Sequence, residues 1–266
     1  MKRLLLLLAS SLLFTSNCFG AIVFDSEAGG NIQGASSKTQ AITVAVQDNR
    51  LLVVAYGGED ATAANLVVTG VTYNGASLTK IHDINHASST YNRGELWYML
   101  APDTGTHNVV VSMTGTVTGG GIRCSSFYGV AQQAPEATQE ATGTTTIATN
   151  TITTITDNAW IIGGGTHAGT GIVPVAVDGE TMSGYGWYYA TYWGGYEPVA
   201  SAAETVFSFT VYPTSQDWCL MSASFAPYVA AAGVIKTLNG LAWASVKTRN
   251  GVAVGSIKTI SGVASQ

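Results

Sequence analysis

Several common features are scarce or missing in this chain. Only 10% of its 266 residues are charged, and it holds 3 cysteines. Helical periodicity is also missing, because no window of 12 or more residues has capped apolar positions at i, i+3, i+4 and i+7. No segment after the N-terminal leader is long and apolar enough to span a bilayer. These absences argue against a helical fold and against a membrane span.

Enzyme signatures are absent too. We find no Gly-x-Ser-x-Gly elbow, no His-Glu-x-x-His, no phosphate-binding glycine loop and no dense carboxylate pair. The best candidate is the group His82, Asp83 and His86. On a loop they could reach one metal ion, but on a strand residues 82 and 86 would lie ~13 Å apart. We interpret the group as a solvated loop and predict no catalytic residues, no metal and no cofactor.

Two further acidic positions have structural explanations. Glu95 precedes Trp97 on an expected strand, where it fits the polar face of a half-buried sheet. Asp178 and Glu180 flank Gly179, which is typical of a hairpin turn. A calcium site at such turns is conceivable, but no spacing specifies one. The chain is therefore not expected to be an enzyme.

The N-terminus reads as a secretory signal peptide over residues 1–20. Lys2 and Arg3 precede an apolar run over 4–14, which is too short to cross a membrane. Small residues favour cleavage before Ala21, and acylation of Cys18 is disfavoured because an asparagine precedes it. The mature chain is expected to be secreted, with an extracellular or surface-associated location.

Removing the leader leaves Cys124 and Cys219 as the only thiols. In an oxidising compartment these two thiols can form a disulfide, and two cysteines allow only one pairing. Both cysteines sit in expected strands, so neighbouring antiparallel strands would bring them together. We predict a disulfide between them; the alternative is two buried free thiols that behave as small apolar residues.

Strand signals recur every 10 to 15 residues, with Gly, Asn, Asp and Pro between them. Asn74-Gly75 lies between two alternating runs and predicts a type I′ hairpin turn. The threonine-rich run over 142–158 favours polar-faced strands over an ice-binding array, because no regular repeat is present. Residues 21–228 are thus expected to form a single large β-sandwich, of the jelly-roll or Ig-like type. The clearest strands are AITVAV (41–46), RLLVVAY (50–56), ELWYML (95–100), HNVVVSM (107–113), AWIIGGG (159–165) and TVFSFTV (205–211).

A repeat region follows an expected linker at 229–234. From residue 235 to 266 the chain reads IKTLNGLAWAS, VKTRNGVAVGS and IKTISGVASQ, with a strict period of 11. Asn239-Gly240 and Asn250-Gly251 occupy equivalent turn positions. The period predicts a small β-meander, or alternatively a β-arc stack. With few large side chains, the repeats are expected to need a partner or further copies for stability.

Charge divides the chain at the same place. Residues 21–234 carry 5 basic and 16 acidic side chains, whereas residues 235–266 carry 4 basic side chains and no acidic one. The basic repeats are expected to mediate self-assembly or to bind a protein partner. Nucleic acid is disfavoured, since four cations are sparse and the acidic region would repel phosphate.

Several segments resemble a known module. NRLLVVAYGGED, VTGVTYNGASLTKI, ELWYMLAPDTGTHNVVVSM and CSSFYGV are similar to strands of an uncharacterised β-sandwich module of secreted bacterial and phage-associated surface proteins. The tail resembles the short KTxNG-type repeats that end many such proteins. The resemblance covers roughly residues 22–228 and implies a surface or structural role, with no catalytic residues to transfer.

The stretch SGYGWYYATYWGGYEP, over 183–198, departs from that module because it is crowded with aromatic rings. A strand over 186–193 would place Trp187, Tyr189, Thr191 and Trp193 on one face and Tyr188, Ala190 and Tyr192 on the other. The face with the tryptophans is the better candidate for the inner one, because tyrosine tolerates water through its hydroxyl. We therefore predict that Trp187 and Tyr189 pack in the core. An exposed, ligand-binding contact surface is then predicted from four residues: Tyr188, Tyr192, Trp193 and Tyr196.

The sequence therefore favours a secreted, non-catalytic surface or structural protein that mediates assembly or adhesion. The alternative is a carbohydrate-binding module or adhesin that uses the exposed aromatic platform, because flat rings stack on sugars. An enzyme is the least favoured class.

Overall fold

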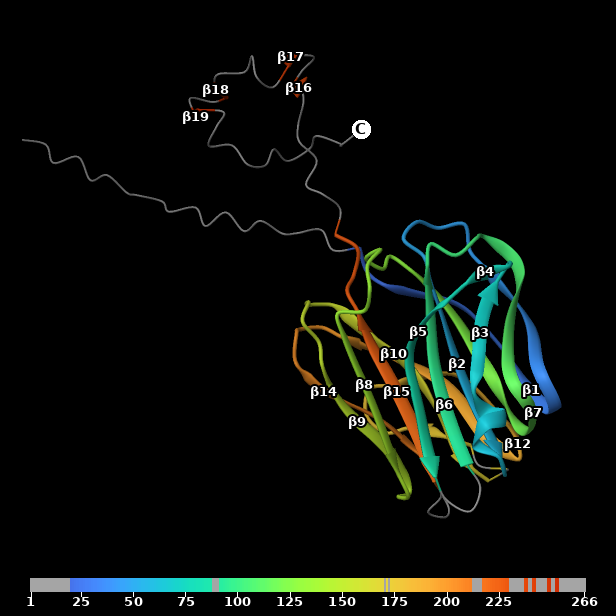
Figure 1. Cartoon of the computed structure of the whole chain (residues 1–266). Helices are drawn as coiled ribbons and strands as arrows, with labels where there is room; N and C mark the ends of the chain where they lie inside the picture. Colours follow the sequence, from blue (N-terminus) through green and yellow to red (C-terminus); the bar gives the residue numbers. More distant parts are fainter. Residues whose placement is uncertain are drawn as a thin grey trace, which may run out of the picture. The chain divides into compact units, whose positions relative to one another are not determined.

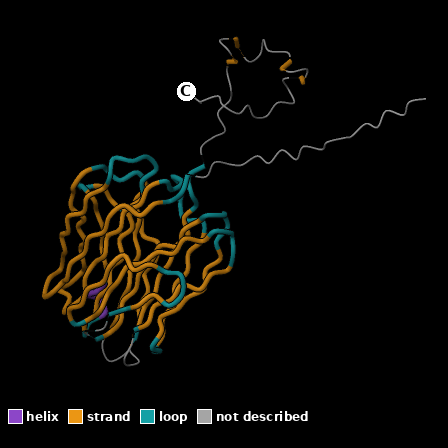
Figure 2. Tube along the Cα trace, turned by 180° about the vertical axis from the view of Figure 1, so that it is seen from behind, coloured by secondary structure: helices purple, strands orange, loops and turns teal. Residues whose placement is uncertain are grey.

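The computed structural model confirms an all-β sandwich fold (Figures 1 and 2). Among the residues that it describes, the one helix is a 3-10 turn at Ala63–Leu66. Residues 20–228 belong to one compact unit. The predicted signal peptide lies outside the described residues, apart from Gly20. The structure describes residues 20–87, 91–169, 171, 173–211 and 217–229, and in the tail 237–238, 241–242, 248–249 and 252–253.

The largest sheet is antiparallel and contains seven strands. Two of them, β1 and β7, pair along nearly their whole length, from Val23 opposite Tyr128 to Val44 opposite Gly105. On its other side, β7 pairs first with β3 and then with β2. The strand order is β4 (Ala76–Ser77), β3 (Val68–Tyr73), β7 (Gly105–Tyr128), β2 (Leu51–Asp60), β6 (Tyr91–Leu100) and β5 (Thr79–Ala87), with β1 (Val23–Val44) beside β7.

Two smaller antiparallel sheets complete the unit. Figure 1 shows β9 and β14 on the left and β1 and β7 on the right, with β10 and β15 between them. The five-stranded sheet has the order β12 (Thr181–Tyr188), β13 (Ala190–Val199), β10 (Ala159–Ala168), β15 (Trp218–Phe225) and β8 (Ala137–Gly143). The three-stranded sheet has the order β11 (Val175–Ala176), β14 (Glu204–Thr210) and β9 (Ile147–Thr153).

Three apolar cores hold these sheets together. Strand β2 contributes to two of them: Leu52 and Val54 lie in the first core, on one face of the largest sheet, and Leu51 and Val53 in the second. Because β2 is buried on both faces, its sequence is a continuous apolar run rather than an alternating one. The second core lies between the largest and the five-stranded sheets. The third lies between the five- and three-stranded sheets and includes Trp193.

Glycines in β10 allow the sheets to approach closely. A Cβ atom on Gly164 would lie 2.5 Å from the backbone oxygen of Trp193 and 2.7 Å from the Cβ of Ala55. Gly165 would similarly collide with the Trp193 ring. The run Gly163 to Gly165 therefore serves close packing of layers, as glycine does where another backbone comes near.

In the tail, two short hairpins are described. β16 (Thr237–Leu238) pairs with β17 (Leu241–Ala242), and β18 (Thr248–Arg249) pairs with β19 (Val252–Ala253). Each pair flanks one of the predicted Asn-Gly turns. The third repeat lies outside the described residues. No described helix has the length and apolar character needed to cross a membrane.

Candidate binding surface

The aromatic stretch forms a hairpin rather than one strand. Tyr188 pairs with Ala190, so the chain reverses at Tyr189, which has a φ of 59°. A left-handed conformation is uncommon for a residue other than glycine. Register places Trp187 opposite Thr191 and Tyr185 opposite Trp193. The predicted continuous strand over 186–193 is therefore wrong, since β12 ends at Tyr188 and β13 begins at Ala190.

The tip of this hairpin is exposed. Trp187 is 44% exposed to solvent, and Tyr189 is 54% exposed. The Trp187 ring stacks on that of Tyr185, with centroids 5.6 Å apart and planes at 17°. Tyr185 itself packs against the third core. The prediction that Trp187 and Tyr189 lie in the core is wrong, because both lie at the turn end of the hairpin, where they are exposed.

Tyr192 and Trp193, predicted to be exposed, are buried instead. Tyr192 faces the largest sheet, where its hydroxyl lies 2.5 Å from Asn31 Oδ1 and its ring centroid 5.6 Å from Arg123 Cζ. Burial raises the pKa of Tyr192 to about 12, although the Arg123 charge lowers it. Trp193 faces the third core, where its ring lies 6.0 Å from that of Phe209. Neither side chain is available as a contact surface.

Tyr196 is enclosed by other rings. It stacks against Phe24 at 5.2 Å and against Trp160 at 5.1 Å, at angles of 21° and 13°. Its prediction as a ligand platform is also wrong, because both ring faces are covered. The side chain of Tyr188, the fourth predicted residue, lies outside the described residues.

A second exposed apolar area lies on the outer face of the three-stranded sheet. In β9, Thr149, Thr151 and Thr153 point outward while the intervening residues are buried, as the polar-faced strand prediction requires. Apolar side chains surround these threonines. They are Ile147 (41% exposed), Val173 (46%), Val175 (55%), Val177 (47%) and Val206 (51%).

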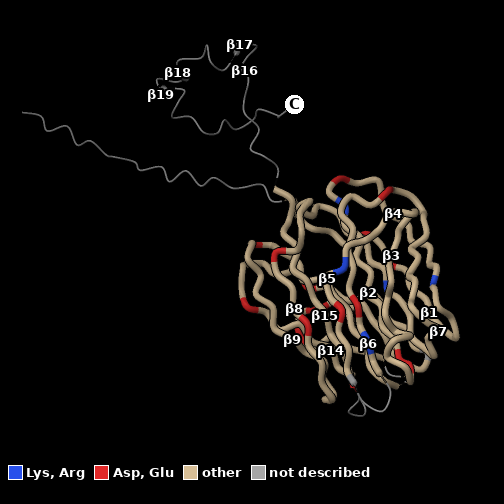
Figure 3. The backbone as a smooth tube through the Cα atoms, viewed as in Figure 1, with Lys and Arg blue, Asp and Glu red and all other residues tan. Residues whose placement is uncertain are grey.

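Through the turn at 177–180, β11 of this area leads into β12, the first strand of the aromatic hairpin, and the two strands are in contact. Thr146, Ile147, Val173, Val175 and Thr210 line a depression of about 430 Å³. We call Trp187, Ile147, Val173, Val175 and Val206 together the apolar surface. It is made of uncharged residues in a unit where acidic positions outnumber basic ones (Figure 3).

The charged side chains around Glu95 pair with one another. Glu95 is fully buried, and its carboxylate accepts hydrogen bonds from the backbone N–H of Val68 at 2.9 Å and from Trp97 Nε1 at 3.2 Å. It also pairs with Lys80 at 2.8 Å and with Arg93 at 3.1 Å. Burial raises the pKa of Glu95, and the contact with Lys80 opposes that shift. The expected half-exposed position is wrong, and the cluster joins β5, β6 and the start of β3.

The three residues considered for a metal have separate partners. His82 Nδ1 lies 2.9 Å from Glu140 Oε2. Asp83 pairs with Lys80 at 2.8 Å. His86 Nδ1 lies 3.6 Å from an Asp217 oxygen. All three lie on strand β5 rather than on the expected loop. Among the residues that the structure describes, no group of three or more His, Cys, Asp or Glu side chains is arranged to hold a metal ion.

The acidic turn in VDGETM is held by hydrogen bonds to the side chain of Glu180. Glu180 accepts hydrogen bonds from the backbone N–H groups of Val177, Asp178 and Ser208 and from the Ser208 hydroxyl. Nearby Glu197 has one buried carboxylate oxygen without a hydrogen-bond partner. Burial, together with the charges of Glu180 and Asp178, raises the pKa of Glu197 to about 7. The predicted hairpin turn is wrong, because β11 pairs with β14 and β12 pairs with β13, so this bend joins strands of two sheets and Glu180 stabilises it.

The two cysteines are free and buried, so the predicted disulfide between Cys124 and Cys219 is wrong. Cys124 lies in β7 and faces the first core, whereas β15, which carries Cys219, belongs to the five-stranded sheet. The Cys219 thiol donates a 3.4 Å hydrogen bond to the Asn92 carbonyl. Burial raises the pKa of both thiols to about 12. They behave as small core side chains, the alternative left open by the sequence.

No protein-family model, no curated protein and no solved structure matches the chain. Function must therefore be argued from the geometry of this molecule. The exposed hairpin tip was missed by sequence reasoning because Tyr189 carries no turn signal of the Gly, Asn or Pro type. The crowding of aromatic rings over 185–196 was the signal that pointed to the right segment.

Proposed function

We propose that the chain is a secreted, non-catalytic surface protein that self-assembles through its apolar surface. The observation that carries this proposal is the 44% exposure of Trp187 at the hairpin tip. Tryptophan is enriched among residues that dominate protein interfaces. Its stacking on Tyr185, with planes at 17°, holds the ring in one orientation before contact, which lowers the entropy lost on binding.

The chemistry around Trp187 supports the same reading. The valines and isoleucine of the apolar surface gain about 25 cal/mol for each Å² of apolar area that contact removes from water. The unit from 21 to 234 has an excess of 11 acidic side chains, so two copies repel each other elsewhere on their surfaces. The area carries few charges, with the exposed Glu204 beside Val206 on β14, so copies can meet there with less electrostatic opposition than elsewhere.

The basic repeats over 235–266 fit the same proposal. They carry 4 basic side chains against an acidic large unit, so attraction between different copies adds to contact through the apolar surface. Their two described hairpins have strands of only two residues each. Such short hairpins gain stability from pairing with further strands.

The experiment compares the mature chain, residues 21–266, with Val175→Glu by light scattering. Val175 is 55% exposed, so the added charge should weaken assembly at least tenfold without unfolding the protein. Val46→Glu is the matched control, since Val46 is 84% exposed and lies outside the apolar surface. Removing residues 235–266 should also weaken assembly. Equal assembly by all four proteins would refute the proposal.

A second candidate is glycan binding at the hairpin. Its specific support is the exposed indole of Trp187, because a flat ring suits stacking on the apolar face of a sugar. This candidate predicts a monomer that binds a glycan array through Trp187. Loss of array binding in Trp187→Ala, with no assembly of the wild-type chain, would favour it over the first proposal.

A further inference from the structure

A separate depression opens on the largest sheet, where the β3–β4 hairpin meets the start of β5 and the end of β6. It encloses about 370 Å³, within the ~300–1,000 Å³ range typical of small-molecule sites. None of its lining residues belongs to β12 or β13, so it is distinct from the aromatic hairpin. The walls are Tyr73, Ala76, Ser77, Thr79, Tyr98, Met99, Leu100, Ala101 and Asp103.

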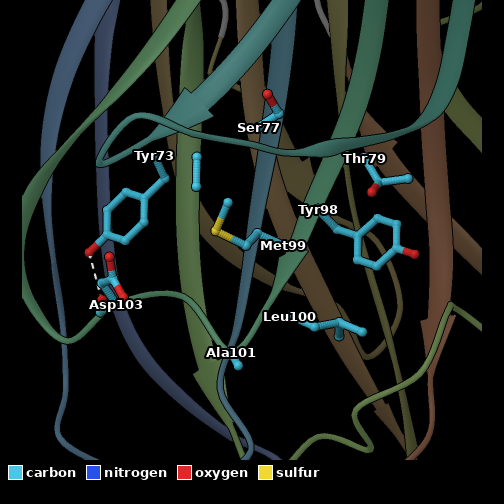
Figure 4. Close-up of a pocket in the computed structure, with 9 residues that line it drawn as sticks. Tyr73, Ser77, Thr79, Tyr98, Met99, Leu100, Ala101 and Asp103 are labelled. Carbon is cyan, nitrogen blue, oxygen red and sulfur yellow. Dashed lines mark hydrogen bonds between the residues drawn. The ribbon is translucent and has the colours of Figure 1, made fainter.

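The walls divide by chemistry. Figure 4 shows Met99 between Tyr73 and Tyr98, with Leu100 below Tyr98. The hydroxyl-bearing Ser77 and Thr79 lie on the segment that crosses above, and both residues are exposed. Tyr98 is partly buried, because its ring packs against Phe225 at 5.9 Å. Met99 packs against the first core, whereas Tyr98 and Leu100 pack against the second, so the apolar side chains lie on both faces of β6 below the hydroxyl groups.

Asp103 contributes the single charge among the lining residues, and its position is fixed. Asn74 Nδ2 donates a 2.9 Å hydrogen bond to Asp103 Oδ2, and the Tyr73 hydroxyl donates to the Asp103 carbonyl at 3.0 Å. The turn that carries Asp103 includes Ala101, which has a φ of 47°. A left-handed alanine is held there by its surroundings, and such strained positions are found disproportionately at binding sites. The hydrogen bond from Asn74 goes to Oδ2 of the Asp103 carboxylate and not to Oδ1.

We propose that this depression binds a neutral sugar residue. A sugar ring has an apolar face of C–H groups, which suits the Met99 side chain, and hydroxyls on its rim. Those hydroxyls match the donor and acceptor groups of Ser77 and Thr79. The Asp103 carboxylate accepts hydrogen bonds only, and bonds from sugar hydroxyls to a charged acceptor are stronger than neutral ones.

Other small ligands match this site less well. An anion would be repelled by Asp103, because no Lys or Arg lines the depression, and Arg50 donates its Nε hydrogen to the Pro102 carbonyl instead. A quaternary ammonium ion has no hydrogen to donate and would leave the rim hydroxyls without partners. A purely apolar ligand would bury Asp103 uncompensated, which is unfavourable.

The test uses saturation-transfer NMR on the mature chain with the methyl glycosides of glucose, galactose, mannose and N-acetylglucosamine. We expect at least one glycoside to bind. Asp103→Asn and Thr79→Val should each weaken that binding by about tenfold, which equals ~1.4 kcal/mol. Both replacements are nearly isosteric, and thermal melts of each variant establish that it folds.

Val46→Ala is the matched control, and it should leave glycoside binding unchanged, since Val46 is exposed and lies outside the depression. Binding that is lost in Trp187→Ala but kept in Asp103→Asn would place the sugar at the hairpin and overturn this proposal. So would the failure of all four glycosides to bind, or binding of tetramethylammonium in their place. None of these results bears on self-assembly, so the two proposals can fail independently.

Discussion

The rings of Tyr185 and Trp187 stack with their centroids 5.6 Å apart, yet their surroundings differ. Tyr185 packs against the third core, while Trp187 is 44% exposed. Across the hairpin, Trp193 pairs with Tyr185 and is fully buried. Burial on this face therefore falls from the base of the hairpin to its tip. The ring near the base packs in the core, and the ring near the tip is exposed to solvent.

The first prediction concerns stability along this gradient. Trp193→Ala should lower the free energy of unfolding by ~3–5 kcal/mol, because a large buried ring is removed from the third core. Trp187→Ala should lower it by less than about 1 kcal/mol, since much of that ring is already in water. Denaturant melts of both variants provide the measurement. Equal losses would mean that the hairpin tip is as tightly packed as its base.

The second prediction follows from the raised pKa of Glu197, about 7 against an ordinary value of 4.5. Since folding favours the protonated acid, its stabilising contribution is complete below about pH 4.5 and is lost as pH rises through 7. Glu197→Gln should therefore stabilise the protein at pH 8, by on the order of 1 kcal/mol after allowance for solvent screening, and have little effect at pH 4.

Thermal melts at the two pH values measure this difference. Glu204→Gln, which alters an exposed carboxylate in β14, is the control and should show no such pH dependence. A stabilisation by Glu197→Gln that is the same at pH 4 and pH 8 would contradict the assigned role of the charge.

The third prediction concerns Glu95, which is fully buried between Lys80 and Arg93. Glu95→Ala should lower the free energy of unfolding by ~3–5 kcal/mol, because it leaves the Val68 N–H and Trp97 Nε1 without their acceptor and leaves Asp83 as the remaining partner of the two cations. Glu140→Ala is a milder comparison, since Glu140 pairs with His82 from a side chain that is 44% exposed. Urea unfolding of the two variants should separate them clearly, and similar midpoints would show that the Glu95 cluster contributes little.

The fourth prediction is that Cys124 and Cys219 remain thiols in the folded protein under oxidising conditions. Their burial raises both pKa values to about 12, so iodoacetamide should label neither in the folded chain and both after denaturation without reductant. Mass spectrometry counts the labels. A denatured chain that takes up label only after reduction would restore the disulfide that the sequence suggested.

Local signals predicted local structure well. Asn74 and Gly75 have φ values of 47° and 82°, and Tyr73 pairs with Ala76, as expected for a type I′ hairpin. The apolar run in β2 and the alternating exposure of β9 also follow from their sequences. These features depend on residues close together in the chain, where propensity and periodicity apply.

Features set by contacts between strands far apart in the sequence were missed. Glu95 occupies a polar position on its strand, but Val68 and Trp97 cover it in a way that strand periodicity does not encode. The two cysteines are on strands, as predicted, yet those strands belong to different sheets. For the aromatic residues, the predicted exposures of Trp187 and Trp193 were both wrong, because Trp193 packs in the third core while Trp187 lies near the exposed turn of the hairpin.

Sedimentation velocity of the mature chain over a range of concentrations tests the central claim most directly, with Trp187→Ala and Val46→Ala as matched variants. If the apolar surface drives assembly, wild type and Val46→Ala should form larger species as concentration rises, and Trp187→Ala should need at least tenfold more protein to do so. A wild-type chain that stays monomeric throughout, or a Trp187→Ala variant that assembles like wild type, would contradict the account.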